Sequence, residues 1–78
     1  MAKIIKIGNA TDDANSQRFD VFPSLTMEET LILTDKSYNK YYWIKCDNHE
    51  EMIKLHRQSQ TQWADWLSLE MLKNSQTN

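Results

Sequence analysis

The chain contains few of the residues that punctuate or cross-link small folds, with one cysteine, one proline and one glycine in 78 residues. The single cysteine, Cys46, cannot form an internal disulfide, so a disulfide-stapled scaffold is excluded. With so little glycine and proline, an all-β sandwich with many tight turns is disfavoured. Gly8, the one glycine, cannot build a glycine-rich phosphate cradle.

Long apolar runs and blocks of basic residues are also missing. No run approaches the roughly 18 apolar residues that a membrane span needs. The segment 1–7 interrupts its isoleucines with lysines and lacks the apolar stretch of a signal peptide. The 9 basic and 11 acidic residues are interleaved and give a net charge of -2, so no basic block tracks phosphates. We therefore expect a cytoplasmic protein that does not contact membranes.

What the chain does contain is typical of one folded domain. Hydrophobic residues make up 40% of the sequence and charged residues 26%, close to globular averages. The length suits a single core, which we place at residues 1–73, followed by a disordered polar tail at 74–78. Because a core of this size leaves much of the chain's surface exposed to solvent, we expect a second copy to stabilise the fold and predict a homodimer.

Three segments carry strand signals. Lys3–Ile7 is rich in β-branched isoleucine and precedes the turn signal Gly8-Asn9. Arg18–Phe22 alternates charge with apolar bulk before Pro23 stops it. The strongest signal is Lys40–Cys46, which we expect to pair antiparallel with the segment before it.

The segment 26–34 is ambiguous. Thr26 and Glu29 match the capping box of a short helix, whereas Thr30–Thr34 is an apolar run that favours a strand. We favour the strand, joined to Lys40–Cys46 by a hairpin turn over 35–39, and keep the short helix as the alternative.

The rest of the chain is expected to be helical, from a start at 47–50 capped by Asp47 to about Lys73. The stretch 57–62 is polar, and Ser59 with Gln62 could cap a second helix there. Without glycine or proline, one continuous helix is favoured. The arc expected to face the sheet contains Met52, Ile53, His56, Trp63, Leu67 and Met71, with Leu55 and Trp66 at its margins.

The predicted fold class is therefore α+β. A small antiparallel sheet of three to four strands packs on one long C-terminal helix, in the order β-β-β-β-α.

No complete catalytic or metal-binding constellation is present. Cys46, His49 and His56 fall short of the four ligands of a structural zinc site. Cys46 with a histidine could form a nucleophilic pair, but no third group stands out to orient the imidazole. We interpret these as structural residues and predict a non-enzyme without metal or cofactor.

The strand 40–46 carries large apolar side chains on both faces, which bears on function. Alternation places Tyr42, Ile44 and Cys46 on one face and Tyr41 and Trp43, with Lys45, on the other. One helix covers one face, so the second set should be exposed or buried by another chain, unless the loop 10–16 covers it. The residues expected to contact a partner are Tyr38, Tyr41, Trp43, Lys45, Trp66, Leu69 and Leu72.

These observations predict a small protein-binding module that occludes a surface on another macromolecule. In size and composition the chain is similar to small acidic inhibitors that phages and mobile elements direct against host machinery. The alternative is a nucleic-acid-binding accessory protein, because basic and aromatic residues interleave in and around the predicted hairpin. The interleaved residues are Lys36, Tyr38, Lys40, Tyr41, Trp43 and Lys45.

Overall fold

The computed structural model describes residues 1–10 and 17–75, which fold into a four-stranded antiparallel sheet and two helices. The elements are β1 (Lys3–Asn9), β2 (Phe19–Pro23), β3 (Thr30–Asp35), β4 (Lys40–Lys45), α1 (His49–His56) and α2 (Gln60–Ser75). The strand order in the sheet is β1-β4-β3-β2, so β1 and β2 form its two edges. The α+β prediction is confirmed.

The segment 30–35 is a strand, so the alternative of a short helix is wrong. Leu31 and Leu33 are both fully buried while Ile32 between them is half-buried, which is the period of two that a strand gives. β3 and β4 form the expected antiparallel hairpin, with Asp35 opposite Lys40 and Thr30 opposite Lys45. Asn39 closes the turn at φ 54, a conformation that asparagine tolerates better than most residues.

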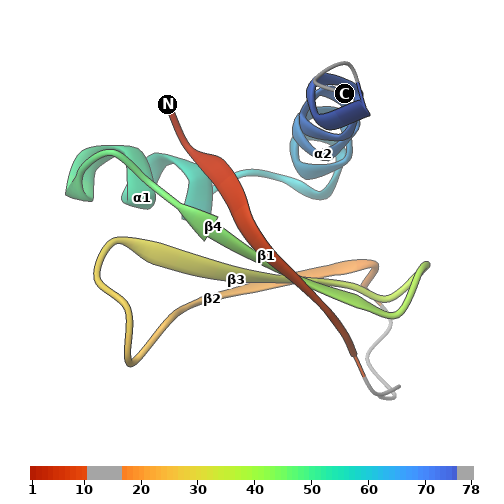
Figure 1. Cartoon of the computed structure of the whole chain (residues 1–78), viewed down its shortest axis with the longest axis horizontal. Helices are drawn as coiled ribbons and strands as arrows, with labels where there is room; N and C mark the ends of the chain where they lie inside the picture. The colour runs from red at the N-terminus through yellow and green to blue at the C-terminus, as the bar shows by residue number, and fades with distance from the viewer. Residues whose placement is uncertain (11–16, 76–78) are drawn as a thin grey trace.

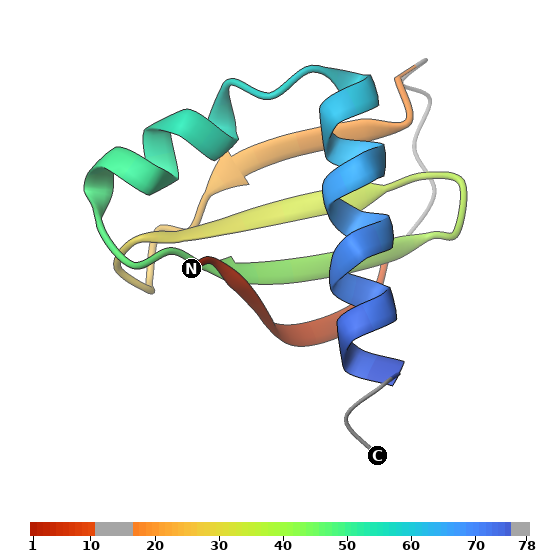
Figure 2. The same cartoon turned by 90° about the horizontal axis from the view of Figure 1, so that it is seen from above.

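The helical region is broken, so the prediction of one continuous helix is wrong. α1 ends at His56 and α2 starts at Gln60. Ser59 and Gln62 cap the second helix reciprocally: the Gln62 backbone N–H donates to Ser59 Oγ at 3.2 Å, and the Ser59 N–H donates to Gln62 Oε1 at 2.9 Å. The polar stretch between the helices offers no apolar side chain to bury, and a break there lets α2 change direction and cross the strands (Figure 2).

The break also changes which side chains meet the sheet. In α1 the buried residue is Leu55, while Ile53 and His56, expected on the inner arc, are exposed. In α2 the expected Trp63 and Leu67 are buried. The predicted arc assumed 100° per residue through both helices as if they were one. The break changes the helical phase, so the arc that fits Trp63 and Leu67 in α2 does not fit Ile53 and His56 in α1.

Two details at the helix ends also differ from expectation. The cap of α1 is Asn48, whose side chain accepts from the Glu51 N–H at 2.8 Å, whereas the Asp47 carboxylate pairs with the Met1 ammonium group. α2 extends to Ser75, two residues beyond the expected end at Lys73. The other tail residues, 76–78, lie outside the described part of the chain.

Both helices lie on the same face of the sheet (Figures 1 and 2). The core between these layers is built from side chains of β2, β3 and β4 together with α1 and α2. Its buried apolar members are Ala2, Phe19, Leu31, Leu33, Tyr42, Ile44, Cys46, Leu55, Trp63 and Leu67. The opposite face of the sheet carries neither helix.

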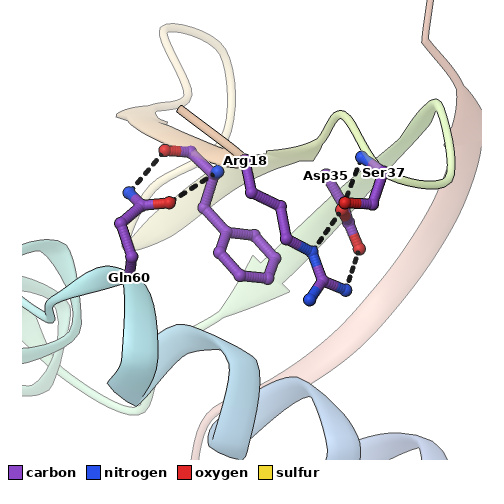
Figure 3. A network of polar contacts seen from close by, with 5 residues as sticks. Arg18, Asp35, Ser37 and Gln60 are labelled. Atoms are coloured by element: carbon purple, nitrogen blue, oxygen red, sulfur yellow. Dashed lines mark hydrogen bonds and ion pairs between the residues drawn. The ribbon is translucent and has the colours of Figure 1, made fainter. Parts of the chain in front are cut away.

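The edge strand β2 is held at its start by a side chain of α2 (Figure 3). The Gln60 amide accepts from the Phe19 N–H and donates to the Phe19 carbonyl, both at 2.8 Å. These two bonds replace those that a neighbouring strand would make, and Pro23 ends the strand without an N–H. The other edge strand, β1, has a register shift between Ile4 and Lys6. The Gln60 bonds and Pro23 on β2, and the register shift on β1, discourage edge-to-edge association.

Candidate functional site: the open face of the sheet

The face opposite the helices carries a row of side chains that crosses all four strands. Lys6 pairs with Trp43 across β1 and β4, Trp43 with Ile32 across β4 and β3, and Ile32 with Phe22 across β3 and β2. Directly paired residues point to the same face, so the four side chains form one line. We name the open face by the residues Lys3, Lys6, Phe22, Ile32, Tyr41, Trp43 and Lys45.

The division of β4 into two faces agrees with the sequence prediction. Tyr42, Ile44 and the adjacent Cys46 are buried under the helices, whereas Tyr41, Trp43 and Lys45 are half-buried on the other side. The predicted alternative, that the loop 10–16 covers Tyr41 and Trp43, involves residues that lie outside the described ranges apart from Ala10.

The indole of Trp43 lies against β1. A Cβ on Gly8 would come within 3.1 Å of the ring, so a side chain at that position would displace it. The Lys6 ammonium group stands 4.9 Å from the ring centroid, and Tyr41 meets the ring edge-on at 5.9 Å. The sequence marked Gly8 as a turn residue. Its role beneath Trp43 depends on the register of β1 against β4, which the sequence does not specify.

Charges that are interleaved along the chain are separated in space. The open face holds Lys3, Lys6 and Lys45. Among the described side chains that the register places on this face, Asp20 is the one acidic residue. Its carboxylate lies 2.6 Å from Lys36 Nζ. The segment 47–75 that contains both helices instead carries five carboxylates against three lysines and arginines. The open face is therefore cationic on a chain of net negative charge.

The connection between β2 and β3 adds an apolar tip next to the open face. Ser24 Oγ accepts from the N–H groups of Thr26 and Met27, at 3.2 and 3.0 Å, and orders the turn. Leu25 at its tip is 98% exposed, and Phe22, where the open face meets this turn, is 45% exposed. A fully exposed leucine on an ordered turn has no role in the core. Sequence reasoning missed it, although the Ser24-x-Thr26 spacing is typical of such turns.

The remaining predicted contact residues lie on the helix side. Tyr38 and Leu72 line a groove of about 540 Å³ between α2 and the β3–β4 turn, together with Arg18 and Met71. Leu69 is also exposed on α2. Trp66 is half-buried, edge-on against Trp63 at 5.5 Å. The structure thus divides the predicted contact residues between two surfaces, and Tyr41, Trp43 and Lys45 are those on the open face.

An ion pair forms the polar end of this groove (Figure 3). Arg18 Nε and Nη2 donate to the two carboxylate oxygens of Asp35, at 3.0 and 3.1 Å, and the Ser37 N–H donates to one of them at 3.1 Å. The hydrogen bond to Asp35 raises the pKa of Arg18 above its ordinary value. The guanidinium is therefore already neutralised by a buried partner.

The candidate catalytic residues differ in their exposure to solvent. Cys46 is 1% exposed, and burial raises the pKa of its thiol to about 11, with Glu51 and Glu29 adding to the effect. An activated nucleophilic cysteine needs a lowered pKa. His49 and His56 are exposed on α1. Within residues 1–10 and 17–75, no group of three or more histidine, cysteine or acidic side chains could hold a metal ion.

The raised pKa of Cys46 leads to a pH-dependent stability. The folded chain holds the thiol proton more tightly than the unfolded chain, so this stabilisation is present below about pH 9 and is lost as the pH rises towards about 11. Urea unfolding at a series of pH values should show a steeper alkaline loss for the wild type than for Cys46→Ala, by about 1–2 kcal/mol. Equal losses would show that the thiol ionises freely in the folded protein.

Comparison of the chain with protein-family models, with curated proteins and with solved structures gave no match. In the described part of the chain, neither helix combines the length and the apolar character needed to cross a bilayer.

Proposed function

We propose that this protein is a small binding module that contacts another protein through the open face of its sheet. The observation that supports the proposal is the row Lys6–Trp43–Ile32–Phe22, which lies on the face that neither helix covers. Aromatic side chains grouped at the centre of a surface are typical of binding hot spots. Such a module acts by covering a surface of a larger macromolecule and needs no catalytic residues for this activity.

Single-stranded nucleic acid is the second candidate, because the open face combines lysines with aromatic rings. Two contacts count against it. Trp43 is engaged by Lys6 and packed at Gly8, which leaves less of the ring for a stacked base. Lys40 of the same hairpin, which the sequence-based alternative assigned to phosphate contact, donates to Asn9 Oδ1 at 2.7 Å. Its ammonium group is therefore already hydrogen-bonded.

Face-to-face pairing of two copies would place two cationic surfaces, each carrying Lys3, Lys6 and Lys45, against each other. Like charges oppose such pairing. We therefore propose a different protein as the main partner. The predicted homodimer and the cytoplasmic setting remain open predictions, and the mass of the purified chain in solution tests the first of them.

Affinity capture with matched variants tests the proposed function. A tagged chain should retain its partner after nuclease treatment, and Tyr41→Ser/Trp43→Ser should lose it. The control Leu69→Ser/Leu72→Ser removes two exposed apolar side chains from α2 and should retain the partner. If the first variant is unfolded by circular dichroism, Lys6→Glu serves instead, because Lys6 is exposed. Capture that is lost on nuclease treatment would support the nucleic-acid candidate instead.

A further inference from the structure

We infer that the partner presents an acidic protein surface with an apolar depression, and that Leu25 is the side chain that enters this depression. The inference rests on the proposed function, because it names the kind of partner that the open face fits. Two independent features support it, the distribution of charge on the face and the exposure of the ordered turn beside it.

The charge distribution favours an acidic partner. Lys3 and Lys45 are opposite each other on β1 and β4, and Lys6 follows on the same face. Lys45 Nζ donates to the Glu28 carbonyl at 2.7 Å, which holds its ammonium group near the turn without neutralising its charge. Among the residues that the structure describes, the acid that shares this face is Asp20, which is itself paired with Lys36. A surface of carboxylates is therefore complementary to this face, and such complementarity raises association rates and sets orientation.

The turn supplies an apolar anchor at one end of the same surface. Leu25 is 98% exposed and Met27 and Phe22 are both more than a third exposed. The backbone that carries them is fixed by the two bonds to Ser24 Oγ and by the Ser24 N–H, which donates to the Thr30 carbonyl at 2.8 Å. Because the backbone of this turn is already ordered, inserting Leu25 costs little backbone conformational entropy. An aliphatic side chain that fills a pocket on the partner can serve as the anchor of an interface.

An acidic protein fits these features better than nucleic acid. A phosphate backbone would use the three lysines, but it offers no pocket for Leu25 and Met27. Carboxylates around an apolar depression would use both features at once. Glu28 and Glu29 belong to the same turn, so the partner's carboxylates have to face Lys3, Lys6 and Lys45 while its apolar depression faces Leu25.

Site-specific photo-crosslinking tests the inference. A photoreactive residue placed at Leu25 should not disturb folding, because Leu25 contacts so little of the protein. The matched control is the same residue at Leu69, which is 58% exposed on α2. In lysate, position 25 should give a protein adduct, and the crosslinked peptide, identified by mass spectrometry, should have net negative charge. Raising NaCl from about 50 to about 300 mM, or introducing Lys3→Gln/Lys6→Gln, should lower the adduct yield at least about fivefold.

The outcomes separate the two proposals. An adduct from position 25 to a neutral or basic segment, or one whose yield does not change with salt, would overturn the acidic partner while leaving the binding role of the open face intact. An adduct with nucleic acid, or with a second copy of this chain, would overturn both. Adducts from Leu69 with none from position 25 would place the interface on the helix side and would also overturn both.

Discussion

Replacing Arg18 with methionine is expected to destabilise the protein by about 2–3 kcal/mol. Its partner Asp35 is completely buried and would keep one donor, the Ser37 N–H. Removing one member of a fully buried pair costs about 3–5 kcal/mol. The value here is lower because the Arg18 side chain is 39% exposed, so water already screens part of the interaction.

A double substitution separates the cost of an orphaned charge from the loss of packing. Arg18→Met/Asp35→Leu removes both charges, and its free energy of unfolding should lie within about 1 kcal/mol of the wild-type value. Urea and thermal unfolding measure both variants, and the single variant should melt roughly 10–20 °C lower than the wild type. The control is Lys54→Met, at an exposed position on α1. Equal stability of the single and double variants would contradict the orphaned Asp35 charge as the cause of the destabilisation.

Phe22→Glu is expected to weaken partner binding by about 30-fold or more, which corresponds to about 2 kcal/mol at an interface anchor. The substitution removes an apolar ring from the end of the row that crosses the open face. It also adds a carboxylate to a cationic surface that we infer to meet acids. Because Phe22 is 45% exposed, the free energy of unfolding should change by less than about 1 kcal/mol.

Leu72→Glu is the matched control for that experiment. Leu72 is also about half exposed, but it lies on α2 beside the helix-side groove. Titration of both variants against the captured partner should leave the affinity of Leu72→Glu close to that of the wild type. The reverse pattern would place the interface at the groove.

The sequence alone predicted the sheet well because its signals are local. β-branched and aromatic residues in Lys40–Lys45 favour a strand, and alternation along it separated Tyr42 and Ile44 from Tyr41 and Trp43. The same reasoning failed where distant contacts decide. Nothing local to Ile53 and Leu55 shows that Leu55 is the residue that packs into the core, since this depends on where α1 ends and how α2 crosses the strands.

The candidate site was predicted in part. Tyr41, Trp43 and Lys45 were placed on one face from their spacing. Their neighbours Lys6, Ile32 and Phe22 belong to three other strands, and the pairing register that brings them together is set by the folded sheet. The separation of charge has the same origin. Acids and bases alternate along the chain, and a cationic face arises when β1 and β4 bring Lys3, Lys6 and Lys45 to one side.

Hydroxyl-radical footprinting of the free and partner-bound chain tests the role of the open face most directly. In the free protein Phe22, Leu25 and Leu72 should all be modified, because all three side chains are at least two-fifths exposed. Binding should protect Phe22 and Leu25 and leave Leu72 and Leu69 reactive. Protection of the two α2 leucines with continued reaction at Phe22 and Leu25 would show that the partner binds the helices and not the sheet.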